Sequence, residues 1–189
     1  MENTFNLIIT KIAAFLNKDR QCSQTQFQQM YYGLQILVYN ILVAAFILII
    51  AAITRSFLSS LLVLIVFGTF RILAGGHHFN HMGICLLSTT AVIISAGKCA
   101  QFIRFSTPVT IVFCIILNII LLSYLPKGTV KNPFSDSFSR IQQKRLRIAS
   151  VTMTILALFF LHLRSGILLA MIFAVIFLLP SFIHQIRMK

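Results

Sequence analysis

Reactive side chains are concentrated in residues 71–85. This stretch holds His77, His78 and His81, which are three of the five histidines, together with Cys85 and three of the eight glycines. A thiol beside an imidazole is the arrangement that cysteine nucleophiles use, because a protonated imidazole stabilises the thiolate. The residue types therefore make Cys85 a candidate nucleophile with a neighbouring histidine as its base. The structural alternative stays open, because a histidine at a membrane interface is usually a headgroup or hydrogen-bond contact and a cysteine in an apolar segment is usually a packing residue.

The spacing of these residues places a condition on the backbone. On one straight helix His78 and Cys85 would share a face but lie about 10 Å apart along the axis, at roughly 1.5 Å per residue. Contact between them requires the chain to break or to re-enter, which Gly75, Gly76 and Gly83 would allow. Non-helical backbone at membrane depth is tolerated only where it lines a cavity. We therefore expect a broken or re-entrant stretch at the active site.

Two other uses of the stretch stay open. His77, His78, His81 and Cys85 are all transition-metal ligands, so a metal-binding membrane protein is one alternative. It is disfavoured because the adjacent His77 and His78 point apart on any regular backbone. The other alternative is a small peptide transporter or exporter without covalent chemistry, with the glycine-rich break as its pathway. Against it stands the lack of an intramembrane carboxylate for ion coupling and of a phosphate-binding loop for ATP.

The elements that must position this stretch are apolar. The 189 residues are 58% hydrophobic and only 10% charged, with a mean hydropathy of +0.93, which is typical of an integral membrane protein. About 20 apolar residues cross the hydrocarbon as a helix. By that measure we expect an all-α polytopic protein with six spans, at residues 33–53, 56–74, 82–97, 107–125, 148–163 and 165–183.

The remaining segments complete a single membrane domain over residues 1–189, with a transmembrane bundle at 33–183. Residues 1–32 place apolar side chains at helical spacing among Lys and Gln, which predicts an amphipathic segment on the membrane surface. Residues 126–147 form a basic connector with prolines, and we expect a helix to begin at one of its serines, at 135, 137 or 139. The first ten residues lack a basic region, so we expect no cleaved signal peptide.

The net charge of +13 is distributed between the apolar runs, so we expect contacts with the lipid bilayer and no nucleic-acid partner. Four cations fall on one side of the membrane: Arg55, Lys98, Arg104 and Arg164. The other twelve fall on the opposite side. The positive-inside rule then places both termini, the reactive stretch and the basic connector in the cytoplasm.

The three acidic residues, Glu2, Asp19 and Asp136, all lie outside the expected spans. Paired-aspartate intramembrane proteases, zinc proteases of the H-E-x-x-H type and carboxylate proton relays each need an acidic residue that this chain does not supply at depth. A thiol or hydroxyl nucleophile with an imidazole base is what remains.

Isolated polar and sulfur side chains are interpreted as structural. The cysteines show no paired spacing, which argues against disulfides and C-x-x-C metal sites. The structural group comprises Cys22, Cys99, Cys114, His162 and His184. Asn40 and Asn118 fall within expected spans, where an amide most often bridges two helices.

The pattern Arg71-x-x-Ala74-Gly75-Gly76-x-His78, followed by Cys85, resembles the signature of the accessory gene regulator protein B (AgrB) family. These are bacterial membrane peptidases that process quorum-sensing peptides. The similarity extends over most of the chain, including the basic connector with its prolines. The resemblance implies a multi-pass protein of the bacterial cell membrane in which His78 and Cys85 form a catalytic pair, with no cofactor and no metal.

The resemblance also implies the substrate and the reaction. An AgrD-type propeptide would be cleaved before its acidic tail to leave a thioester on Cys85, and a Cys or Ser of the peptide would then close a thiolactone or lactone ring. Substrate binding would involve Arg71, Gly75, Gly76 and Lys131, and family habit suggests a homodimer.

The additional imidazoles of His77 and His81 depart from the family pattern, so either could serve as the base if the register differs. No acidic residue is available to orient the base.

Overall fold

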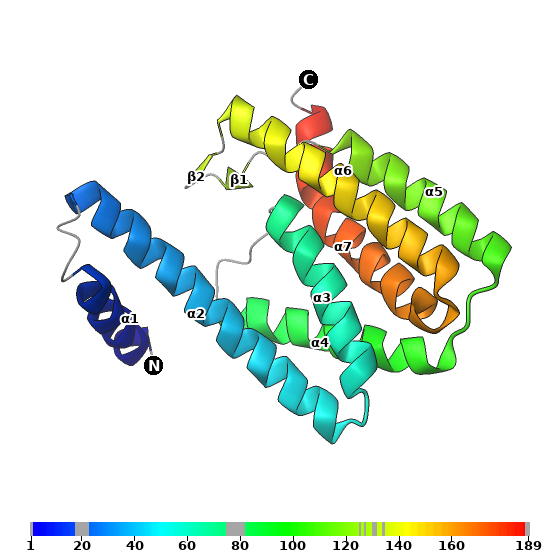
Figure 1. The fold of residues 1–189 in the computed structure, drawn as a ribbon, viewed down its shortest axis with the longest axis horizontal. Helices are drawn as coiled ribbons and strands as arrows, with labels where there is room; N and C mark the ends of the chain where they lie inside the picture. Colours follow the sequence, from blue (N-terminus) through cyan, green and yellow to red (C-terminus); the bar gives the residue numbers. More distant parts are fainter. Residues whose placement is uncertain are drawn as a thin grey trace. The chain divides into compact units, whose positions relative to one another are not determined.

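The computed structural model of the chain describes residues 2–17, 23–74, 82–124, 126, 128–129, 132–133 and 135–187. Over these residues the protein is built from helices, apart from one pair of two-residue strands (Figure 1). The helices are α1 (Glu2–Asn17), α2 (Gln24–Ile53), α3 (Phe57–Ala74), α4 (Met82–Phe102), α5 (Thr107–Ser123), α6 (Asp136–Phe159) and α7 (Leu161–Arg187). The strands β1 (Gly128–Thr129) and β2 (Asn132–Pro133) pair antiparallel in the basic connector. The prediction of an all-α fold is confirmed.

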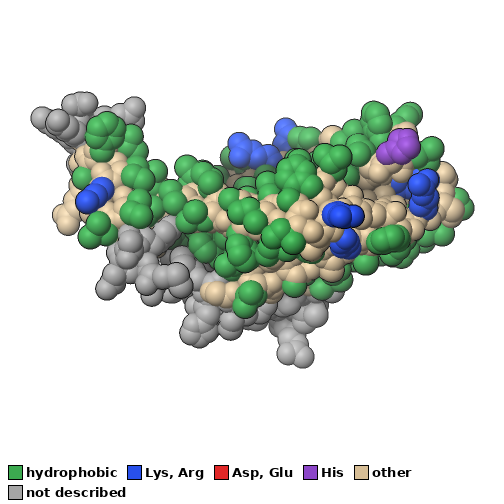
Figure 2. All heavy atoms as spheres, turned by 90° about the horizontal axis from the view of Figure 1, so that it is seen from below, with side chains coloured by type: hydrophobic (Ala, Val, Ile, Leu, Met, Phe, Trp, Pro, Cys, Tyr) green, Lys and Arg blue, Asp and Glu red, His purple; other side chains and the backbone are tan. Residues whose placement is uncertain are grey.

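Within the described part of the chain, four helices are long and apolar enough to cross a membrane: α2, α3, residues Cys85–Phe102 of α4 and residues Leu161–Leu178 of α7. Helix α5 is apolar but has 17 residues. Apolar side chains predominate on the face drawn in Figure 2, with Lys and Arg scattered among them. These features fit a protein that lies in a bilayer, while the expected number of six spans stays a prediction.

The chain divides into two compact units, residues 1–46 and 47–189. In the first unit, α1 buries Ile9 and Ala13, four residues apart, and exposes Leu7 and Phe15. Residues four apart lie on one face of a helix, so α1 has one buried face. The expected helix at the N-terminus is therefore present. The expected boundary at residue 33 is wrong as a helix boundary, because α2 begins at Gln24. The placement of α1 on a membrane surface stays a prediction, as does the single membrane domain.

Helix α7 is the centre of the second unit. It packs against α3, α4, α5 and α6, and it buries a continuous apolar row. That row consists of Ile167, Leu168, Met171, Ala174, Val175 and Leu178. The spacing of three, four and seven residues places these side chains on a shared stripe of the helix. In a bilayer such a stripe holds helices together through close van der Waals packing.

Two glycines allow neighbouring helices to approach α3 closely. A Cβ placed on Gly97 of α4 would lie 2.9 Å from the Cα of Ser60, and one on Gly166 of α7 would lie 2.7 Å from Leu62 Cδ2. By contrast, a Cβ on Gly68 of α3 would meet no atom within 4 Å. Small residues at helix contacts are common in membrane bundles because they let the backbones come together.

Three helix boundaries can be compared with the sequence-based expectations. Helix α6 begins as expected, because Ser135 is its N-cap and accepts a hydrogen bond from the Phe138 amide. Helix α4 continues to Phe102, so the expected end at residue 97 is wrong and Lys98 lies within the helix. The expected boundary between the last two spans at residue 164 is also wrong, because α6 ends at Phe159 and α7 begins at Leu161.

Arg164 explains the shifted boundary. It lies in the first turns of α7, and only 5% of its surface is exposed. Its guanidinium donates hydrogen bonds to the carbonyls of Ala157 and Leu158 at the end of α6, and to the Phe105 carbonyl and the Thr107 hydroxyl at the start of α5, at 3.1–3.3 Å. A cation that satisfies the last carbonyls of one helix in this way can be buried next to a helix break.

Candidate active site

Cys85 lies in the first turns of α4, which begins at Met82. Its side chain is a half-buried free thiol. Arg71, in the last turn of α3, donates a hydrogen bond from Nη2 to the Cys85 sulfur at 3.4 Å. The end of α3 and the start of α4 are therefore joined by a contact between a cation and the expected nucleophile.

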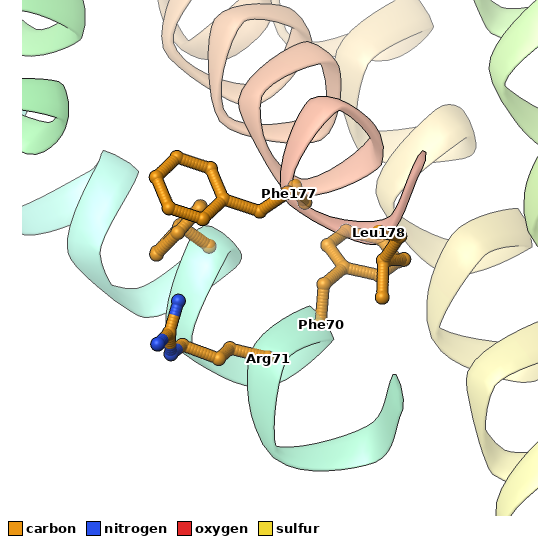
Figure 3. Close-up of a pocket in the computed structure, with 6 residues that line it drawn as sticks. Phe70, Arg71, Phe177 and Leu178 are labelled. Atoms are coloured by element: carbon orange, nitrogen blue, oxygen red, sulfur yellow. The ribbon is translucent and has the colours of Figure 1, made fainter. Parts of the chain in front are cut away.

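Two aromatic rings fix the position of the Arg71 guanidinium. The guanidinium carbon lies 6.0 Å from the centre of the Phe67 ring on α3 and 5.8 Å from the centre of the Phe177 ring on α7. The two rings pack edge to face, with centres 5.7 Å apart. Cations at about 6 Å from a ring centre are attracted to it. Figure 3 shows the Arg71 side chain directed to the same side of α3 as the Phe177 ring.

These side chains line a pocket between α3 and α7. Its walls are formed by Phe67, Phe70, Arg71, Ala174, Phe177 and Leu178. Arg71 is the charged member of an otherwise apolar lining. An arginine remains ionised in proteins and presents several donors in a planar fork, so this pocket supplies a fixed positive charge next to a thiol.

The other residues predicted for the site lie outside the described part of the chain. They are Gly75, Gly76, His77, His78, His81 and Lys131. The pairing of His78 with Cys85, the expected break in the backbone and the assignment of substrate binding therefore stay predictions. Among the described residues no three His, Cys, Asp or Glu side chains lie close enough to hold a metal ion. This leaves the metal alternative open, because its three histidines are among the undescribed residues.

Sequence reasoning missed Tyr124. This residue follows the last turn of α5, and its hydroxyl donates a hydrogen bond to the carbonyl of Ala74, the last residue of α3, at 3.3 Å. The side chain is 4% exposed. A tyrosine near the end of an apolar run, two residues before Pro126, is typical of the aromatic belt at a membrane interface. The sequence therefore gave no sign that this hydroxyl reaches the residue directly before Gly75.

Residues assigned to structural roles can be placed in part. Asn118 bridges α5 and α6, as expected of a polar side chain within a span: its amide donates to the Thr154 hydroxyl and its oxygen accepts from the Ser150 hydroxyl. Cys114 is buried and Cys99 is exposed. Asn40 is exposed on α2. Cys22 and the side chain of His184 lie outside the described residues.

In a comparison with protein families, the family model described as accessory gene regulator B matches residues 9–183 of the chain. The match includes both sides of the Arg71–Cys85 contact and the basic connector. No curated protein and no solved structure matches the chain.

Proposed function

The chain belongs to the accessory gene regulator B family, whose members act in a bacterial quorum-sensing system, and we propose that it is a membrane cysteine endopeptidase for an AgrD-type propeptide. In this proposal Cys85 is the nucleophile and His78 is the base. The enzyme removes the C-terminal tail of the propeptide and promotes cyclisation of the remaining peptide.

The observation that carries the proposal is the contact between Arg71 Nη2 and the Cys85 sulfur at 3.4 Å. A cysteine that serves only to fill space needs no cation. This thiol is half-buried, is not in a disulfide and accepts a hydrogen bond from a guanidinium that two aromatic rings hold in place. Reactive cysteines are found in such electropositive, partly exposed surroundings.

In the first step His78 takes the thiol proton, and the Cys85 sulfur attacks the carbonyl carbon of the peptide bond before the tail. A carbon–sulfur bond forms, and the carbonyl electrons move to oxygen. When the carbonyl re-forms, the carbon–nitrogen bond breaks and the imidazolium returns its proton to the leaving amine. The products are the free tail and a thioester between the peptide and Cys85.

In the second step a Cys or Ser side chain within the peptide attacks the same carbonyl carbon. The base accepts its proton, a ring bond forms, and Cys85 leaves as a thiolate that takes the proton back. Exchange of one thioester for another makes and breaks bonds of the same type, so closure to a thiolactone has little thermodynamic cost. Water would hydrolyse the acyl-enzyme, and a site at the ends of two apolar helices limits its access.

The remaining parts of the proposal concern the substrate and the membrane. Arg71, Gly75, Gly76 and Lys131 contact the propeptide, and the excess of cytoplasmic Lys and Arg favours its acidic tail. Both termini and the active site face the cytoplasm of a multi-pass protein in the cell membrane. The protein acts as a homodimer and needs no cofactor.

The test is co-expression with the AgrD-type propeptide, with tail release followed by mass spectrometry. We expect wild type to release the tail, and Cys85→Ala and His78→Ala to lose this activity by at least 100-fold, because each removes one member of the reacting pair. Cys99→Ala is the matched control, since Cys99 lies on the same helix α4 and is exposed. It should keep the wild-type rate.

His77→Ala and His81→Ala test the register of the base. Both should retain more than a third of the wild-type rate. Loss of activity in one of them with normal activity in His78→Ala would move the role of base to that histidine. Unchanged processing in Cys85→Ala would eliminate the endopeptidase and leave transport as the function to examine.

A further inference from the structure

A hydrogen bond joins two segments that lie fifty residues apart in the sequence, at the point where helix α3 ends. The Tyr124 hydroxyl donates to the Ala74 carbonyl at 3.3 Å. Carbonyls in the last turn of a helix have no partner within the helix, and Ala74 is the last residue of α3. Tyr124 thus provides a partner, from outside the helix, for the final carbonyl of α3.

The backbone that carries Tyr124 is itself held by helix α6. Gln143 Nε2 donates to the Tyr124 carbonyl at 3.3 Å, and Arg147 Nη2 donates to the Leu122 carbonyl at 3.3 Å. The ring of Tyr124 is buried, with 4% of its surface exposed. Because both ends of the residue are fixed, its hydroxyl has a defined position against which α3 can be aligned.

The contact between Tyr124 and Ala74 lies in the same helical turn as the residue that contacts Cys85. Ala74 directly precedes Gly75 and Gly76, and Arg71, three residues earlier, contacts Cys85. Arg71 and Ala74 lie in the same last turn of α3, so a bond that holds the Ala74 carbonyl also holds the turn that carries the guanidinium. That bond comes from Tyr124.

We propose that Tyr124 is a positioning residue for Cys85 in the reacting pair: its hydroxyl fixes the last turn of α3, and thereby the Arg71 guanidinium that contacts the Cys85 sulfur. This inference rests on the proposed function, because positioning matters only if the pair reacts. In this proposal Tyr124 acts through the last turn of α3 and not on the substrate itself. Its loss should therefore reduce the rate of the chemical step without weakening substrate binding.

The experiment uses the full chain in liposomes with a synthetic AgrD-type propeptide. Tyr124→Phe removes only the hydroxyl, and Tyr32→Phe is the matched control, because Tyr32 is 50% exposed on α2. For each variant we would measure kcat and KM for tail release, the midpoint of thermal unfolding, and amide hydrogen exchange in residues 71–74. For Tyr124→Phe we expect kcat to fall by about 5- to 10-fold, KM and the unfolding midpoint to stay unchanged, and exchange in residues 71–74 to accelerate.

Two results would overturn the inference. Wild-type kcat in Tyr124→Phe would show that the hydroxyl does not position the pair. A fall in kcat accompanied by a matching rise in KM and a lower unfolding midpoint would show a general structural role. If wild type itself releases no tail, the proposed function fails, and hydrogen exchange then tests the contact between Tyr124 and Ala74 by itself. Unchanged exchange in residues 71–74 of Tyr124→Phe rejects that contact, and faster exchange supports it.

Discussion

Replacing Arg71 by methionine removes the guanidinium from Cys85 while keeping an unbranched side chain on the last turn of α3. In the native chain the Arg71 donor lies 3.4 Å from the sulfur. The methionine can still pack against Phe67 and Phe177, so the pocket between α3 and α7 stays filled. The substitution therefore isolates the effect of the positive charge on the thiol.

The size of the effect follows from the strength of the contact. A hydrogen bond to a charged group contributes about 1.5–3 kcal/mol to the state that it stabilises. We take the lower end, about 1.5 kcal/mol, because both side chains are half-buried and solvent weakens the interaction. That figure corresponds to roughly a tenfold change in an equilibrium constant. A less stabilised thiolate reacts faster, with a Brønsted coefficient of about 0.4–0.5, which offsets about half of the effect. Arg71→Met should thus slow the reaction of Cys85 with iodoacetamide by about threefold, and the release of the tail by at least as much.

The assay needs Cys85 as the only cysteine. A background with serine at positions 22, 99 and 114 meets that condition, and alkylation is then followed by mass spectrometry at neutral pH. Arg71→Lys should fall between wild type and Arg71→Met, because it keeps the charge but loses the planar fork that fits between two rings. Arg104→Met is the control, since Arg104 is an exposed cation in the loop before α5.

The alkylation rate of Cys85 in Arg71→Met decides whether the guanidinium activates the thiol. If Arg71→Met alkylates within twofold of the Arg104→Met control, the guanidinium does not activate the thiol. If alkylation is unchanged but tail release is lost, Arg71 acts on the substrate, which is the role that the family resemblance implied. Slower alkylation together with slower tail release supports activation of Cys85.

Three further predictions concern stability in detergent, measured as thermal unfolding. Gly97→Ala should destabilise the chain by about 1–3 kcal/mol through overpacking against α3. Gly68→Ala should be neutral or stabilising, because a Cβ there meets no atom within 4 Å. Equal unfolding midpoints for the two variants would refute the close approach of α4 to α3 at Gly97. Arg164→Met should cost about 2–4 kcal/mol, because it deprives three carbonyls and a hydroxyl of their shared donor, and the same change at Arg104 should cost nothing measurable. Asn118→Leu should cost about 0.6 kcal/mol, the average for interhelical hydrogen bonds in a membrane bundle; a gain in stability would contradict the bridge.

The sequence predicts those parts of the fold that depend on local signals. The start of α6 could be narrowed to three serines, at 135, 137 and 139, because serine side chains satisfy the free amides of a first turn, and Ser135 is the one that caps the helix. The end of α3 at Ala74 was expected because Gly75 and Gly76 follow a long apolar run. Signals of this kind act within a few residues, so they do not depend on how distant parts of the chain pack.

Arg164 shows where such signals fail. A lone arginine between two apolar runs was interpreted as part of a polar connector, since isolated cations are costly in hydrocarbon. In the structure it lies inside the bundle, because the end of α6 and the start of α5 meet there and offer it oxygen atoms. Phe105 precedes Arg164 by 59 residues, a separation over which no periodicity carries information.

The candidate site also combines a residue that local sequence signals identify with contacts that they do not. Cys85 could be singled out by its residue type and by its histidine neighbours. Its contact with Arg71 spans fourteen residues, and the contact of Tyr124 with Ala74 spans fifty. Both depend on how separate helices pack, so Arg71 could be named from the family pattern alone and Tyr124 not at all.

The hydrogen-bond partners of Arg164 determine how its contacts respond to low pH. A buried arginine is usually neutralised by a carboxylate, and such a pair loosens when the carboxylate takes up a proton at low pH. Here the hydrogen-bond acceptors are three backbone carbonyls and one hydroxyl, none of which binds a proton in the range where cells grow. Acidification of the surroundings therefore does not act on these four hydrogen bonds, which join the end of α6 and the starts of α5 and α7 at low pH as they do at neutral pH.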